Sequence, residues 1–356
     1  MLYKFSYYIK NGLLIEVIYL KGILLCAGRG SRMLPFTLTT PKTLLPVVNR
    51  PMLDHSIEKL RDAGVNEIGV VINPSQTQII EHLDAMYPRQ NIKVFEQTEP
   101  LGVAHAIRSI QKFVEQEPFV LLLADNLFVE PLDNLIRLSE EGNTTVLLGE
   151  VSNPQDFGIA LIEKGKIVNL EEKPANPKSN LAIMGAYVFQ PSIFEAIYKI
   201  PPSTRGEYEI TDAIQWLIDQ KQTVCYEKTK LPIFDVGTLD RWLEANSFLL
   251  AETDSRMLKV GTNTRIEGCK IIGNVIIGDG CDLTDAVIGP NVAIEDGCIV
   301  RNCSIENSIL LKNTLVDTPC SIINSILGRE SILQGGNIAQ KIVRCILEDY
   351  SMYKFN

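Results

Sequence analysis

The spacing of apolar and polar residues changes near Val260, which divides the chain into two parts. From Lys21 to Ala251, short apolar runs typical of buried strands alternate with stretches that have the apolar spacing of amphipathic helices. This order is typical of an α/β fold with a Rossmann-like, mostly parallel sheet and right-handed crossovers. We therefore predict an α/β domain over residues 21–254.

Apolar runs and turn signals also give bounds for individual elements. The predicted strands are 22–26, 70–72, 93–95, 119–124, 183–189 and 233–234, with a hairpin of 160–162 and 167–170. The predicted helices are 51–63, 75–86, 103–114 and 206–220. A capping box of Ser75 and Gln78 opens the second helix. Asp125 and Asp235 lie at the carboxyl ends of two predicted strands, where open α/β sheets bind their ligands.

Beyond Val260, apolar residues recur every five or six positions, and glycines follow several of them. The recurring residues are Ile266, Ile272, Ile277, Leu283, Ile288, Ile294, Val300 and Ile305, and the glycines are Gly273, Gly278 and Gly289. This period is typical of the hexapeptide repeats of a left-handed parallel β-helix, whereas a small β-sandwich would alternate with period two. We predict a β-helix with a C-terminal tail over 255–356. In the tail, Ile338, Ile342 and Ile346 suit a helical stripe, while 347–355 resembles a last coil, and both interpretations stay open.

Residues 1–20 are aromatic and apolar but do not have the features of a secretion signal. Glu16 interrupts the only apolar run, and no small-residue cleavage site follows it. We interpret this segment as an N-terminal extension of the kind that an upstream start codon would add.

Composition narrows the possible partners and the compartment. The 356 residues suffice for roughly two domains of about 150 residues each. The net charge of −9 argues against a nucleic acid polymer as partner, because binding to its phosphate backbone needs a basic face. We expect no membrane partner either. The eight cysteines include no CxxC pair, so we expect buried thiols in a reducing cytoplasm.

A loop rich in glycine and cations follows the first predicted strand. Its residues are Ala27-Gly28-Arg29-Gly30-Ser31-Arg32-Met33-Leu34-Pro35, with Pro41-Lys42 shortly after. Glycines let the backbone approach a ligand closely, and Arg32 and Lys42 bring two cations to the same loop, as a triphosphate requires. A dinucleotide fingerprint would need a glycine in place of Met33, and the Gly-Lys-Ser/Thr of a Walker loop is absent.

Seven segments in a fixed order resemble the sugar-1-phosphate nucleotidylyltransferases. They are the loop just described, EQTEPLGVAHA (96–106), LADN (123–126), DFGIA (156–160), EEKP (171–174), RGEYEITDA (205–213) and FDVGT (234–238). Within that family, the resemblance is to the long form of the glucose-1-phosphate thymidylyltransferases, and it covers residues 21–350.

The resemblance implies transfer of a nucleoside monophosphate from dTTP to glucose-1-phosphate, by Mg²⁺-assisted in-line attack on the α-phosphorus that expels pyrophosphate. Arg32 would bind the leaving pyrophosphate, Lys42 the phosphates beside it and Lys173 the sugar phosphate. Asp125 and Asp235 would hold Mg²⁺, which prefers carboxylate and phosphate oxygens, and we expect them to end neighbouring strands. The implied nucleotide-binding residues are Ala27, Gly28, Gly30, Ser31, Gln97 and Gly102, and the implied sugar-phosphate-binding residues are Asn126, Gly158, Glu172, Lys173 and Arg205.

Three alternatives remain open. Residues 33–37 resemble the loop of UTP-glucose-1-phosphate uridylyltransferases, and Val236 replaces the threonine usual at its position, so UTP stays open beside dTTP. A bifunctional enzyme could also transfer acetyl groups on the β-helix, but the histidines of this chain all precede the repeats: His55, His82 and His105. We therefore expect 255–356 to serve assembly or stability, in a homo-oligomer. An inactive regulatory subunit on the same fold would be expected to have lost at least one of the charged site residues.

Overall fold

The computed structural model describes residues 5–10, 13–18, 20–252, 258–336 and 342–355. Contacts within the chain divide it into two compact units, which we describe separately. The first unit is Met1–Gly28 with Met52–Phe234, and the second is Arg29–Pro51 with Asp235–Asn356. The short segment Arg29–Pro51 thus belongs to the same unit as the C-terminal third of the chain.

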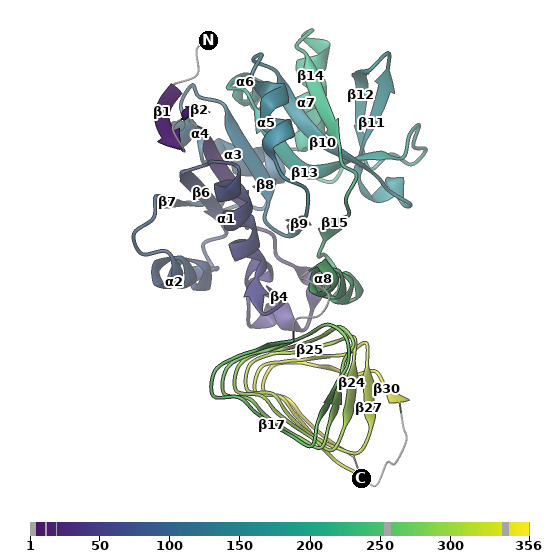
Figure 1. Ribbon diagram of the computed structural model, residues 1–356. Coiled ribbons are helices and arrows are strands. Elements are labelled where there is room, and N and C mark those ends of the chain that lie inside the picture. The colour runs from purple at the N-terminus through teal and green to yellow at the C-terminus, as the bar shows by residue number, and fades with distance from the viewer. Residues whose placement is uncertain (1–4, 11–12, 19, 253–257, 337–341, 356) are drawn as a thin grey trace. The chain divides into compact units, whose positions relative to one another are not determined.

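A nine-stranded sheet forms the first unit, with the strand order β12-β11-β13-β8-β3-β6-β7, β10 beside β13 and β14 beside β10 (Figure 1). Its parallel half contains β3 (Lys21–Leu25), β6 (Glu67–Ile72), β7 (Ile92–Glu96) and β8 (Phe119–Leu123). The helices of this half are α1 (Met52–Asp62), α2 (Thr77–Met86), α3 (Val103–Arg108) and α4 (Gln111–Val114). These strands and the first two helices confirm the predicted α/β pattern, whereas the single helix expected over 103–114 is two helices.

The other half of the sheet is largely antiparallel, so the expectation of a mostly parallel sheet holds only for the first half. Its strands are β10 (Thr144–Glu150), β11 (Gly158–Glu163), β12 (Lys166–Glu172), β13 (Leu181–Phe189) and β14 (Val224–Lys228). Among the pairs that these strands form, only β10 with β14 is parallel. The helices are α5 (Asp133–Ser139), α6 (Ser192–Lys199) and α7 (Ile210–Asp219). The β11–β12 hairpin was predicted, but β10, β14, α5 and α6 were not.

Two helix starts differ from the predictions. The N-cap of α2 is Gln76 and makes no capping hydrogen bond with its side chain, so the capping box of Ser75 and Gln78 is wrong. The hydroxyl of Ser75 instead donates to Asn73 Oδ1 at 2.7 Å. Helix α7 begins at Ile210 rather than at 206, because Gly206 occupies a turn with a φ of 78°.

Two small sheets complete the first unit. The first pairs β1 (Phe5–Lys10) with β2 (Leu13–Ile18) in antiparallel fashion. The second pairs β9 (Asn126–Phe128) with β15 (Ile233–Asp235), whose last residue begins the second unit. Strand β15 is therefore no member of the large sheet, and the expectation that Asp125 and Asp235 end neighbouring strands of one sheet is wrong.

Three sheets of parallel strands form the C-terminal part of the second unit (Figure 1). The first contains β16 (Lys259–Val260), β19 (Val275–Ile277), β22 (Val292–Ile294), β25 (Ser308–Leu310), β28 (Ile326–Leu327) and β31 (Ile346–Leu347). The second contains β17 (Arg265–Glu267), β20 (Asp282–Thr284), β23 (Ile299–Arg301), β26 (Leu315–Asp317), β29 (Ile332–Gly335) and β32 (Met352–Phe355). The third contains β18 (Lys270–Ile271), β21 (Val287–Ile288), β24 (Ser304–Glu306), β27 (Ser321–Ile323) and β30 (Ile342–Val343).

The stacked apolar residues fit the predicted left-handed β-helix. Leu283, Val300 and Val316 lie in register on successive coils, and each is fully buried. Two predicted core positions are wrong, because Ile266 and Ile272 are each 37% exposed. Ile271, the neighbour of Ile272, packs against the core instead. The described part of the tail forms strands of a last coil and no helix, and Ile338 lies outside the described residues.

The rest of the second unit consists of short elements packed on a helix. They are the 3-10 turns η1 (Ser31–Met33), η2 (Phe36–Leu38) and η3 (Lys42–Leu44), the strands β4 (Pro46–Val47) and β5 (Arg50–Pro51), and helix α8 (Leu239–Glu252). Buried Trp242 of α8 fixes them, since its ring meets Phe36 edge-on at 5.4 Å and its Nε1 donates to Pro46 O at 2.6 Å.

Candidate active site

The predicted phosphate loop folds back on itself at Gly30. This glycine has a φ of 65°, and a Cβ atom at its position would lie 2.8 Å from Thr37 Cγ2 and 3.1 Å from Lys42 Cβ. The hydroxyl of Thr37 donates to Gly30 O at 2.9 Å. A side chain at residue 30 would therefore strain the backbone and push Lys42 away.

The start of the loop belongs to the first unit and is hydrogen-bonded to Gln76, the N-cap residue of α2. Gln76 Nε2 donates to Cys26 O at 3.1 Å and to Gly28 O at 3.3 Å. Unlike Gly30, Gly28 does not have a positive φ, and a Cβ there would meet nothing within 4 Å. Gly28 thus leaves open space beside the backbone, and half-buried Ala27 precedes it.

Three of the predicted site residues come together in the second unit. Lys42 is 7% exposed, and its Nζ lies 3.8 Å from Asp235 Oδ1. A Cβ atom on Gly237 would lie 2.9 Å from Arg32 Nη2 and 3.1 Å from Asp235 Oδ1. The guanidinium of Arg32 and the carboxylate of Asp235 thus pack against the bare backbone of Gly237. Ser31, at the start of η1, is exposed.

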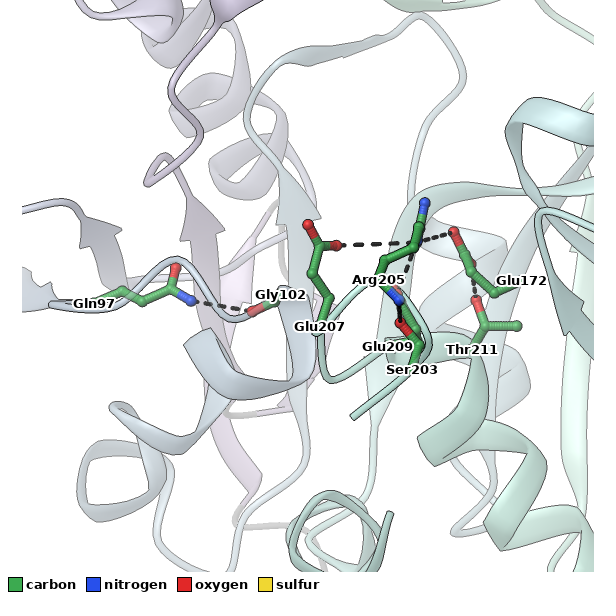
Figure 2. A network of polar contacts seen from close by, with 8 residues as sticks. All are labelled: Gln97, Gly102, Glu172, Ser203, Arg205, Glu207, Glu209 and Thr211. Atoms are coloured by element: carbon green, nitrogen blue, oxygen red, sulfur yellow. Dashed lines mark hydrogen bonds and ion pairs between the residues drawn. The ribbon is translucent and has the colours of Figure 1, made fainter. Parts of the chain in front are cut away.

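In the first unit, the amide of Gln97 has a fixed orientation. Its Nε2 donates to Gly102 O at 3.1 Å (Figure 2). The same nitrogen lies 3.3 Å from His105 Nδ1. Because the hydrogen bond to Gly102 O engages Nε2, the amide offers its carbonyl oxygen Oε1 to a ligand. Gly102 has a φ of 96°, and a Cβ there would lie 2.7 Å from Tyr208 O, so only glycine fits.

Glu172 and Arg205 form a network near the end of β12 (Figure 2). Arg205 Nη2 lies 2.7 Å from Glu209 Oε1 and 3.3 Å from Glu172 Oε1, and Thr211 Oγ1 donates to Glu172 Oε2 at 2.6 Å. Gly158 faces the same group, since a Cβ there would lie 2.6 Å from Thr211 Oγ1. Sequence reasoning missed Glu209 and Thr211, although both lie in the quoted segment RGEYEITDA.

The charge of this network is negative. Burial alone would lower the pKa of Arg205, but the hydrogen bond to Glu209 and the charges of Glu209, Glu172 and Glu207 raise it. Burial, with Glu209 and Glu172 nearby, raises the pKa of Asp212. Because the cation is already surrounded by carboxylates, this network is better suited to accept hydrogen bonds from sugar hydroxyls than to bind a phosphate.

Two more predicted residues lie at the ends of strands of the first unit. Lys173 directly follows β12, has an exposed side chain and donates its backbone N–H to Phe157 O at 2.9 Å. Asn126 begins β9 and donates from Nδ2 to Met184 O at 3.1 Å. Asp125 lies in the turn between β8 and β9.

Comparison with known proteins decides the family. Residues 21–252 match the model of the nucleotidyl transferase family. The chain belongs to this family. It is 35% identical to a glucose-1-phosphate thymidylyltransferase of Streptomyces antibioticus over 76% of this chain and 81% of the relative.

Two further matches show how broad the family resemblance is. A UTP–glucose-1-phosphate uridylyltransferase of Haloferax volcanii is 33% identical over 66% of this chain and 98% of its own length. A crystal structure from Bacillus anthracis, assigned as a glucose-1-phosphate thymidylyltransferase and bound to sucrose, superposes with a TM-score of 0.59 at 30% identity, over 64% of this chain and 94% of that one. The chain is thus an enzyme of the nucleotidyltransferase type.

Nucleotidyltransferases of this family generally use a divalent metal, and the acids present here suit one. Among the described residues, no cluster of three or more His, Cys, Asp or Glu side chains could enclose a metal ion. Mg²⁺ does not need such a cluster, because it binds through one or two carboxylates together with waters and substrate phosphates. Asp125 and Asp235 are the predicted carboxylates. Asp235 ends β15, and Asp125 lies in the turn that follows β8.

None of the eight cysteines of this nucleotidyltransferase, all of which the structure describes, forms a disulfide. Five cysteines are buried and three are half-buried, namely Cys225, Cys269 and Cys345. A hydrogen bond with Cys298 lowers the pKa of Cys281 to about 7, although Cys281 is only 2% exposed. No helix in the described parts of the chain is long and apolar enough to cross a membrane.

Proposed function

We propose that this nucleotidyltransferase transfers a thymidylyl group from dTTP to glucose-1-phosphate and releases pyrophosphate. The observation that carries the proposal is the cluster of Arg32, Lys42 and Asp235 around Gly237, which gathers two cations and a carboxylate beside a glycine-containing loop. The names of the relatives supply the sugar-1-phosphate as the acceptor. The free thiols support a reducing compartment such as the cytoplasm.

The reaction needs little covalent help from the protein. A phosphate oxygen of glucose-1-phosphate attacks the α-phosphorus, the new P–O bond forms, and the bond to the leaving pyrophosphate breaks. Since the nucleophile is already an anion, the protein's task is to hold two polyanions in line and to stabilise the developing charge. Arg32 would bind the pyrophosphate, Lys42 the phosphates beside it and exposed Lys173 the sugar phosphate.

Mg²⁺, held by Asp125 and Asp235, would neutralise charge on the phosphates. The position of Asp235 beside Lys42 supports this assignment, because Nζ and Oδ1 are 3.8 Å apart. A phosphate bound by Lys42 would therefore lie close to a carboxylate that can hold the Mg²⁺ ion. Glu172, oriented by Arg205 and Thr211, would accept hydrogen bonds from the hydroxyls of the sugar.

The base preference follows from Gln97. The Oε1 atom that its amide offers can accept the N3–H of thymine or uracil, whereas N3 of cytosine is itself an acceptor. We therefore infer that both dTTP and UTP are substrates, with dTTP preferred. The uridylyltransferase of Haloferax volcanii supports UTP as the second candidate.

Acetyl transfer on the β-helix is not proposed. All three histidines of the chain precede the repeats, so the repeats supply no imidazole to deprotonate an amine. We expect no release of CoA when the protein is given acetyl-CoA and glucosamine-1-phosphate. A CoA release that deletion of the repeats abolishes would contradict this expectation.

A panel of substrates tests the proposed function. Pyrophosphate release would be measured with dTTP, UTP, CTP, GTP and ATP, each combined with the 1-phosphates of glucose, mannose, galactose and glucosamine. We expect turnover with dTTP and UTP on glucose-1-phosphate and little with CTP or the purines. A strong preference for GTP would overturn the assignment, and no turnover with any pair would favour the inactive regulatory subunit.

A further inference from the structure

The residues just before Lys42 are hydrogen-bonded to the last two coils of the β-helix. Thr39 Oγ1 donates to Asp349 Oδ2 at 2.6 Å, and Arg329 Nη1 donates to Thr40 Oγ1 at 2.6 Å. Thr40 is 3% exposed, so its contact with the guanidinium lies out of solvent. All of these residues belong to the second unit.

Arg329 and Asp349 occupy equivalent positions on one corner of the β-helix. At this corner each coil after the first turns through a residue with positive φ: Gly280, Gly297, Asn313, Glu330 and Tyr350. The residues before them are Asp279, Asp296, Lys312, Arg329 and Asp349. Several of these aspartates accept the backbone N–H of the coil before: Asp279 Oδ1 from Thr262 at 2.7 Å, and Asp349 Oδ1 from Arg329 at 2.7 Å.

Asp349 therefore accepts a hydrogen bond from outside the β-helix in addition to the one within the β-helix that its counterpart Asp279 also accepts. Its Oδ1 serves the ladder of turns, and its Oδ2 serves Thr39. The β-helix is also hydrogen-bonded to a residue that follows Lys42, because Asn49 Nδ2 donates to O of Ile294, the last residue of β22, at 2.6 Å. The segment Arg29–Pro51 is thus hydrogen-bonded to the β-helix both before and after Lys42.

We propose that Arg329 and Asp349 are positioning residues for nucleotidyl transfer, which act by fixing Thr39 and Thr40 and hence Lys42. The β-helix then serves the chemistry as well as assembly or stability. In a reaction that depends on holding phosphates in line, a misplacement of about 1 Å can cost on the order of 10²-fold in rate. This inference rests on the proposed role of Lys42 as a phosphate ligand.

Two pairs of variants separate positioning from stability. Asp349→Ala is matched by Asp279→Ala, which removes the same ladder hydrogen bond without touching Thr39. Arg329→Met is matched by Lys312→Met, whose ammonium pairs with Asp296 at 3.2 Å on the same corner. We expect kcat to fall on the order of tenfold in Asp349→Ala and Arg329→Met, with little change in the KM for glucose-1-phosphate. The two controls should keep kcat within about twofold of the parent, although we expect their melting temperatures to fall as much as those of Asp349→Ala and Arg329→Met.

The double variant Arg329→Met with Lys42→Met shows whether the effect passes through Lys42. If it does, replacing Arg329 costs little more once Lys42 is gone. Equal loss of kcat in each variant and its control, in step with melting temperature, would overturn the proposal. Full additivity of the Arg329 and Lys42 effects would overturn it as well.

A readout without substrate keeps this inference distinct from the proposed function. The amide of Thr40 donates to Phe36 O at 3.2 Å, and that of Leu45 donates to Lys42 O at 3.1 Å, so both report on the segment by hydrogen exchange. We expect exchange in peptides spanning 36–45 to be on the order of tenfold faster in Arg329→Met than in Lys312→Met. Equal exchange would contradict the positioning inference, whereas lack of pyrophosphate release by the unmodified protein would contradict only the proposed function.

Discussion

At the scale of single residues, Gly237 is the position against which two charged site residues, Arg32 and Asp235, pack. A Cβ atom there would lie 2.9 Å from Arg32 Nη2, which is the far end of a flexible side chain. We expect Gly237→Ala to displace the guanidinium and to lower kcat on the order of tenfold or more, with a melting temperature within a few degrees of the parent. Steady-state kinetics and thermal unfolding would show this. An unchanged kcat would mean that Arg32 does not act from this position.

The two carboxylates are tested by removing their charge while keeping their shape. Replacing Asp125 or Asp235 by Asn should lower turnover on the order of 10²-fold and raise the Mg²⁺ concentration needed for half-maximal rate. Titration of activity against Mg²⁺ measures both effects. A near-normal rate for either variant would exclude that aspartate from the metal site.

The base selectivity is assigned to Gln97. Truncation in Gln97→Ala removes one hydrogen bond to the base, and we expect kcat/KM for dTTP to fall on the order of tenfold. The discrimination between UTP and CTP should fall with it. If Gln97→Ala keeps the full preference for UTP over CTP, the base is recognised by another group.

At the residue scale, sequence reasoning can predict a backbone conformation that follows from the local order of residues. The turn at Gly30 could be predicted because a tight, glycine-containing turn after a buried strand is a local feature. Gly237, Gln76 and Arg329 could not, since each acts on residues far away in the chain.

At the scale of elements, the predictions were best where a long apolar pattern fixes the structure. Strand β3 is fully buried along its length, and its continuous apolar run predicted it. Strand β14 escaped prediction because only Val224 of its residues is buried, so no apolar run marks it. The start of α7 was placed too early because nothing local shows that Gly206 and the residues after it form a turn before the helix.

The β-helix offers an internally controlled test of its core. In β21, Ile288 is fully buried, whereas the adjacent Val287 is 36% exposed. We expect Ile288→Ala to destabilise the protein by about 2–5 kcal/mol through lost contacts and a cavity. Val287→Ala should cost no more than about 0.5 kcal/mol. Denaturant unfolding of both variants measures this difference. An equal decrease in the free energy of unfolding in the two variants would contradict the assigned register.

At the scale of the whole molecule, the sequence does not reveal which segments pack together. We predicted a boundary at residues 254 and 255, whereas the contacts also place Arg29–Pro51 with the C-terminal part. No local pattern marks that grouping, because it depends on contacts such as Arg329 with Thr40. The predicted homo-oligomer, the extension over 1–20 and the site assignments remain predictions.

The central claim is that a phosphate oxygen of the sugar-1-phosphate attacks the α-phosphorus of the nucleotide. The most direct measurement uses dTTP and glucose-1-phosphate whose terminal phosphate oxygens carry oxygen-18, with the products analysed by mass spectrometry. The account predicts dTDP-glucose that retains all of the label and pyrophosphate that contains none. Label in the pyrophosphate, or hydrolysis of dTTP without a sugar nucleotide, would contradict it.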